Sequence, residues 1–189
     1  MALALLTISL APVAAQTFEV LVVSRGRLLN ETEAARSLLK AEIELTAELQ
    51  RRVDAVKAEL TAEEEELTRL RATLARDTFA ARVAQFDRKV RTERRQTQRR
   101  AAALQNVFRE ARLKLLEQLG PVLEAVRVDR GASVIINSDQ ALAGDPAIDV
   151  TDEVIARVNS DVPMPEIPDI NSIEEAAMAA PDPAQPDQQ

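Results

Sequence analysis

The sequence predicts a mainly α-helical fold, in which a long antiparallel helical hairpin forms a coiled-coil arm that projects from a small, short-stranded oligomerisation core. Three observations support this fold class. Apolar residues make up 46% of the 189 residues but aromatic residues only 2%, and the dominance of Ala, Glu, Arg and Leu is typical of long helices. No Gly or Pro occurs between Arg27 and Leu119. Short β-branched segments flank this stretch on both sides.

Residues 1–15 have the pattern of a signal peptide. An apolar run at 2–11 is followed by Pro12 and by small residues before Gln16, which predicts cleavage near Ala15/Gln16 and export of the mature chain. The run is too short to span a bilayer, which needs about 20 apolar residues. A buried N-terminal strand or helix is the alternative interpretation.

Residues 16–30 and 128–160 are expected to form a β-rich oligomerisation body. Phe18–Ser24 and Ser133–Asn137 have the composition of short strands, and 149–159 reads as a short helix with Thr151 as its N-cap. So few short elements cannot enclose a core or cover their own edges. We therefore expect the body to assemble with other subunits, as a trimer or a similar oligomer.

Residues 31–127 are expected to form the arm, with its tip near 75–79. Apolar residues recur at coiled-coil spacing from Leu45 to Leu74, and a second series runs from Phe79 to Leu119. Asp77 and Thr78 are good capping residues, so the first helix is expected to end near Ala75. One continuous helix would fit the periodicity equally well.

Charge complementarity favours the hairpin over the continuous helix. Folding the chain near 76–77 makes residues face each other when their numbers sum to about 153, which places Leu49 beside Leu104 and Leu45 beside Phe108. It also places the four consecutive glutamates at 63–66 opposite the basic segment around 87–94. Four adjacent like charges repel one another on an isolated helix, so a basic partner helix would stabilise them.

Two places in the second helix interrupt this pattern. Residues 91–103 (RTERRQTQRRAAA) contain no large apolar side chain, which predicts a loosely packed stretch where the arm can bend. Gly120-Pro121 predicts a kink where the helix enters the body.

Residues 161–189 are expected to be a disordered, acidic, proline-rich tail. Beyond Asp161 the chain holds six of its nine prolines, six acidic residues and no basic residue, a composition that disfavours a packed core. A capping-box pattern at Ser172–Glu175 would allow a short helix as the alternative. The tail could act as a spacer or as a weak internal competitor that occupies the basic arm.

The composition excludes most enzyme chemistry. The chain has no His and no Cys, so it lacks the usual zinc ligands, a thiol nucleophile and an imidazole base. None of its four glycines has the spacing of a nucleotide-binding loop. We expect a protein that is not an enzyme and that binds no metal and no cofactor.

The order of the sequence motifs resembles the Skp/OmpH family of periplasmic chaperones. A leader, the segment FEVLVVSRGRLLNETEAA, a long charged hairpin, SVIINSDQAL and DVTDEVIARVN carry the resemblance from Thr17 to Asn159. It implies a homotrimer with helical arms around a cavity. It also implies an ATP-independent holdase that binds unfolded outer-membrane β-barrel proteins and prevents their aggregation. A passive coiled-coil spacer or envelope tether without client binding is the alternative.

The arm tip is the expected client-binding surface. Residues 76–100 hold nine basic and three acidic residues, although the whole chain has a net charge of -7, and basic tips would attract acidic unfolded clients. The segment lacks interleaved aromatic residues for stacking bases, so nucleic acid is not an expected partner, while contact with anionic lipid headgroups stays open. For each candidate, packing or pairing within the hairpin is the alternative role. The candidate client-contacting residues are Phe79, Val83, Phe86, Arg76, Arg82, Arg88, Arg91 and Arg95.

Overall fold

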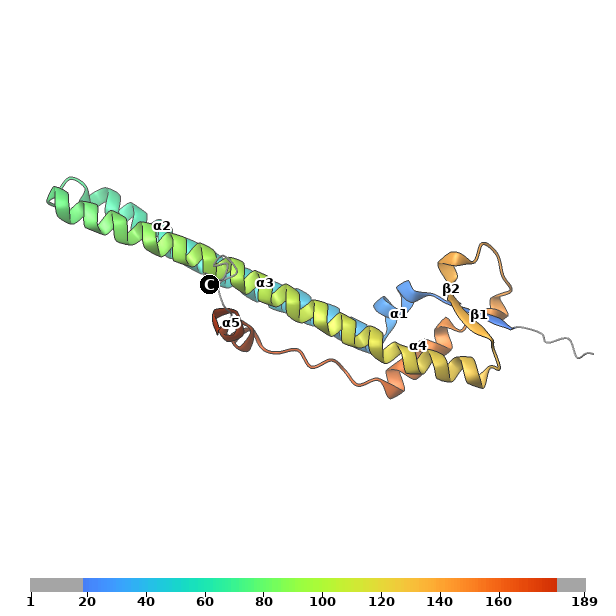
Figure 1. Cartoon of the computed structure of the whole chain (residues 1–189). Coiled ribbons are helices and arrows are strands. Elements are labelled where there is room, and N and C mark those ends of the chain that lie inside the picture. The colour runs from blue at the N-terminus through green and yellow to red at the C-terminus, as the bar shows by residue number, and fades with distance from the viewer. Residues whose placement is uncertain (1–18, 180–189) are drawn as a thin grey trace, which may run out of the picture.

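The computed structural model describes residues 19–179 and shows a long two-helix arm joined to a small body at one end (Figure 1). The mainly α-helical fold class with an antiparallel helical hairpin is confirmed. The expected signal peptide at 1–15 and the last ten residues of the tail lie outside the described residues. Within 19–179, no helix has the length and apolar character that crossing a membrane requires.

Helix α2 (Glu33–Leu70) and helix α3 (Arg76–Asp129) form the arm. With 54 residues, α3 is about 80 Å long at 1.5 Å per residue. Helix α2 ends at Leu70, earlier than the expected Ala75, because residues 71–74 turn back onto the carbonyls of Leu67 and Leu70. The prediction of Asp77 and Thr78 as caps is wrong, since the N-cap of α3 is Ala75 and no side chain caps it.

The predicted pairing of the two helices is confirmed. Leu49, Leu104 and Phe108 are buried in one cluster, with Leu45 packed against it. Two ion pairs hold the same register, Lys89 Nζ with Glu63 Oε2 and Arg112 Nη1 with Glu42 Oε2, each at 2.7 Å. The chain therefore doubles back, which excludes one continuous rod.

Helix α3 continues through Gly120-Pro121, where a kink was predicted, without ending. Both residues are exposed, whereas Leu119, Val122 and Val126 are buried in the body. Packing on these three side chains holds the helix together where the proline removes one backbone donor.

The two strands of the body bring together segments from opposite sides of the arm. Strands β1 (Val20–Val23) and β2 (Val134–Asn137) pair in parallel, with Val20 opposite Val134 and Val23 opposite Asn137. The Val150 amide donates to the Val22 carbonyl at 3.0 Å and bridges the other edge of β1. The remaining elements are two short 3-10 turns and two helices, Ser138–Gln140, Pro146–Ile148, α1 (Arg25–Glu31) and α4 (Thr151–Asp161).

The body has its own core, which the sequence did not predict. Its two four-residue strands make it mixed rather than β-rich. The base of α3 supplies Leu119, Val122 and Val126, and these side chains pack with Leu21 of β1 and Val154 of α4. The expectation that the body elements cannot enclose a core is wrong, because it left out the helix on which they rest.

Thr151 is the first residue of α4 and not its N-cap. Its amide donates to Asp149 Oδ1 at 2.9 Å, and its buried hydroxyl oxygen accepts from the Ser24 amide at 2.9 Å. This pair of bonds ties the start of α4 to the end of β1.

The prediction of a disordered tail is wrong for helix α5 (Ile170–Ala179). After α4 the chain returns along the arm, and α5 packs near its middle (Figure 1). Ile170 and Ile173 are buried in the same cluster as Leu104 and Phe108. The three prolines at 163, 165 and 168 lie before α5 and do not interrupt it.

Asp169 caps α5, one turn before the capping box expected at Ser172. Its carboxylate accepts from the Asn171 amide at 2.8 Å and from the amide and hydroxyl of Ser172 at 3.1 and 3.0 Å. The bond from the Ser172 amide, followed by that from its hydroxyl, holds the pKa of Asp169 below its usual range, since these donors favour the charged carboxylate.

Phe108→Ala should lower the free energy of unfolding by about 3–5 kcal/mol, because it leaves a cavity where α2, α3 and α5 meet. Phe108 is 1% exposed, whereas Leu113 of the same helix is 53% exposed. Chemical denaturation should therefore show a loss for Leu113→Ala of no more than about 0.5 kcal/mol. Equal losses in the two variants would contradict the described packing.

Acid should loosen α5. A carboxyl group with a lowered pKa adds stability that is complete above its ordinary pKa of about 3.9 and is lost as the pH falls through the lowered value. In Asp169→Asn the amide caps the helix without titrating, so α5 should separate less on acidification. Glu174, which faces Arg52 and Arg100, is present in the wild type and in Asp169→Asn, so a difference between the two proteins comes from residue 169. Spin-label distances between α5 and α3, measured from about pH 7 to pH 3, check this; an identical response in both proteins would contradict it.

Candidate functional site

The outer arm, defined as residues 50–100, is a two-helix structure with a partly open apolar seam. No residue in this range is buried. Leu49 and Leu104, which lie just outside the range on the side of the body, are both buried. Two helices cover only one stripe of each other, so the seam residues keep one side in solvent. The outer arm therefore offers apolar surface along much of its length.

The three apolar candidate residues lie on this seam. Phe79, Val83 and Phe86 follow one another at helical spacing in α3, and each is half-buried. This exposure is intermediate between a packed core position and a free surface position. The side chains can stabilise the hairpin and still contact another molecule along its open side.

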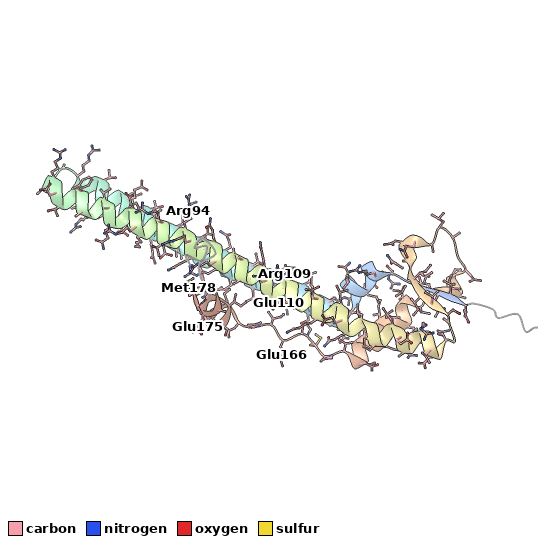
Figure 2. The ribbon with its side chains drawn as sticks, viewed as in Figure 1. Arg94, Arg109, Glu110, Glu166, Glu175 and Met178 are labelled. Atoms are coloured by element: carbon pink, nitrogen blue, oxygen red, sulfur yellow. The ribbon has the colours of Figure 1, made fainter. Side chains whose placement is uncertain are left out.

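The arginine candidates form a charged surface beside the seam. Arg76, Arg82, Arg88, Arg91 and Arg95 are all exposed, and within 19–179 none of them forms an ion pair with a carboxylate. Arg94 lies in the same part of α3, between α5 and the tip (Figure 2). Four of these side chains surround Thr92 in a shallow hollow, namely Arg88, Arg91, Arg94 and Arg95.

The glutamates at 63–66 neutralise less of this charge than the sequence suggested. Glu63 accepts from Lys89 Nζ, and this hydrogen bond raises the pKa of Lys89. Glu66 instead pairs with Arg69 of its own helix at 2.8 Å. Within 19–179, the neighbouring Arg88 and Arg91 form no ion pair with these carboxylates, so they remain available to acidic groups of another molecule.

A second charged contact lies nearer the body, beneath α5. Glu174 Oε2 is 2.9 Å from Arg52 Nη1, and its Oε1 is 3.5 Å from Arg100 Nε. Asn171 Oδ1 accepts from Arg52 Nη2 at 3.0 Å. The sequence suggested that the tail could occupy the basic arm but not which residues make the contact, for which the Ile170-x-x-Ile173-Glu174 pattern within an otherwise polar tail was the available signal.

The stretch at 91–103, which was predicted to be loosely packed, contributes at its C-terminal end to the packing of α5. Ala101 and Ala103 pack against the cluster that contains Ile170 and Ile173. Small side chains on α3 leave room for a third helix, and α5 supplies the large apolar residues that this stretch lacks. The arm is therefore a three-helix structure near its middle and a two-helix structure towards its tip.

The arrangement of the outer arm suits binding. Across residues 19–179, no group of three or more carboxylates is placed to hold a metal ion. The surface instead combines spread apolar contacts with many guanidinium groups, each able to donate several hydrogen bonds to a carboxylate. Such a surface suits broad, adaptable contacts with a polypeptide.

Comparisons with known proteins agree with this architecture. A family model described as outer membrane protein (OmpH-like) matches residues 19–158. Comparison with curated protein sequences gave no match. One similar solved structure is a candidate outer membrane chaperone (OmpH-like) from Caulobacter crescentus CB15, with a TM-score of 0.73 and 17% identity over 83% of this chain and 91% of that chain. At that level of identity the comparison shows a shared fold. The chain belongs to the OmpH-like outer membrane protein family.

Proposed function

We propose that this protein is an ATP-independent periplasmic holdase that binds unfolded outer-membrane β-barrel proteins through its arm and keeps them from aggregating. The observation that carries the proposal is the outer arm, where a half-exposed apolar seam runs beside arginines that have no carboxylate partner within 19–179. Removal of a signal peptide near Ala15/Gln16 would place the mature chain in the periplasm.

Each part of the outer arm has a separate task in this proposal. Arg76, Arg82, Arg88, Arg91 and Arg95 attract acidic segments over a distance and speed their capture. Phe79, Val83 and Phe86 then contact apolar side chains of the client, each burying a modest area. Because single exposed ion pairs contribute about 1 kcal/mol or less, binding depends on many weak contacts and tolerates different client sequences.

We also propose that the body assembles into a homotrimer, so that several arms surround one client. Strand β2 has an exposed residue, Val134, at 42% exposure. Beside it runs an apolar groove lined by Leu28, Leu116 and Leu123. An open strand next to an apolar groove favours association with another chain.

The holdase proposal predicts that the wild-type protein suppresses aggregation of a transmembrane β-barrel protein diluted out of urea. Light scattering after dilution measures this directly. Arg88→Glu with Arg95→Glu should weaken suppression several-fold at low salt, because it reverses two charges of the arginine surface, and should matter less at high salt.

The matched control is Arg36→Glu with Arg109→Glu. It makes the same charge change at two exposed arginines nearer the body and should leave suppression close to that of the wild type. Suppression by none of the proteins would indicate a passive spacer. Equal loss in both variants would show that net charge matters and the outer arm does not.

Light scattering should also give a mass of about three chains for the mature protein. Val134→Glu should reduce this mass, because it places a charge beside the apolar groove. Leu142→Glu, at a fully exposed loop position, should not. A wild-type monomer would contradict the trimer and leave the client-binding test unaffected.

A further inference from the structure

We propose that α5 is an internal ligand bound at a second, inner peptide-binding site on the arm, and that an apolar–acidic segment of a client competes with α5 for this site. The inference rests on the holdase function proposed above and names the chemistry of one of its sites. The site is the surface of α2 and α3 that α5 covers (Figure 2).

The apolar part of the site is built from residues of α3. Leu104 and Phe108 form its floor, and Ala101 and Ala103 are small enough to let another helix approach. Ile170 and Ile173 of α5 insert here and are 8% and 2% exposed. The site therefore accepts two branched apolar side chains that are three residues apart.

The charged part of the site is built from one arginine of each arm helix. Arg52 of α2 and Arg100 of α3 both face Glu174, and the three side chains are 33%, 20% and 18% exposed. A carboxylate directly after the second apolar residue is thus the third recognised feature. Together the contacts define the ligand as a short segment with two apolar residues followed by an acidic one.

Several observations make α5 an exchangeable ligand rather than a fixed part of the fold. It has ten residues, fewer than an isolated helix needs in water, so it is helical only while it is bound. The body has a separate core that contains no residue of α5. The segment that matches the family ends at residue 158, before α5 begins.

The charged contact is also imperfect. Arg100 Nε and Glu174 Oε1 are both buried, and at 3.5 Å neither makes a well-formed hydrogen bond with a described partner. Burying charged groups without good hydrogen bonds offsets part of the stabilisation that their attraction gives. A client segment that places its carboxylate better would therefore displace α5.

The test compares two charge reversals on neighbouring residues of the full-length chain. Glu174→Lys puts a positive charge between Arg52 and Arg100, whereas Glu175→Lys makes the same change at an exposed position of the same helix. Hydrogen exchange of residues 170–179 reports whether α5 is bound. Fluorescence titration with a urea-unfolded transmembrane β-barrel protein, labelled with a dye, reports client affinity.

We expect Glu174→Lys to lose the exchange protection of α5 and to bind the client about tenfold more tightly. The tenfold gain follows if α5 occupies the site in about nine of ten wild-type molecules, because the client can then bind only the remaining tenth. Glu175→Lys should resemble the wild type in both measurements. Saturating client should remove the protection of α5 in the wild type. A second pair, Ile173→Ser and exposed Met178→Ser, should repeat the contrast without a charge change.

The other outcomes separate failure of the competition from failure of the α5 contact and from failure of the holdase function. Loss of protection with unchanged or weaker client binding would overturn competition while leaving the holdase intact. An unprotected α5 in the wild type, or protection that survives both Glu174→Lys and Ile173→Ser, would overturn the described contact. A protected α5 in a protein that binds no client would refute the proposed function, and with it the competition, but not the contact itself.

Discussion

The structure depends on a constraint of helix packing, namely that two antiparallel helices bury only one stripe of each other. Towards the body this limit is relieved, because other elements add a third layer and Phe108 becomes fully buried. Towards the tip no other element of residues 19–179 is added, and Phe79, Val83 and Phe86 stay only half-buried. The same seam therefore stabilises the fold at one end of the arm and offers apolar surface at the other.

Charge is also distributed unevenly along the chain, with a basic outer arm and an acidic C-terminal segment. The outer arm concentrates arginines, while the segment after residue 136 carries all of the net negative charge of the chain. The fold brings part of that acidic segment back onto the arm through Glu174, which meets Arg52 and Arg100. Among residues 19–179, no carboxylate of this segment pairs with Arg88, Arg91 or Arg95, so the arginine surface keeps its charge there. The net negative charge of the whole chain is therefore compatible with a basic surface on the outer arm.

The body explains how so long an arm is held in place. Strands β1 and β2 are separated by more than 100 residues, yet each residue of one pairs with a residue of the other. Short parallel strands are weak by themselves, and here they rest on the base of α3 and on α4 through one buried core. The base of α3 is therefore fixed in the body by side-chain packing as well as by the strands that precede and follow the arm.

The sequence by itself determined the hairpin and its register. The apolar period is a local property of each helix, and the opposed charges of Lys89 and Glu63 allow only a narrow range of alignments. The helix ends were less well predicted, because the turn at 71–75 is held by backbone hydrogen bonds to which capping residues contribute nothing.

Only the tertiary structure decided the fate of the tail and the core of the body. Ile170 and Ile173 lie in a proline-rich, acidic segment whose composition favours disorder, and their helix forms because the paired arm presents a surface for them. That surface joins α2 to α3, so it does not exist until the chain has folded back. The core of the body likewise needs the base of α3 beside strands distant in sequence. Both features depend on long-range contacts, which a reading of local pattern and composition does not contain.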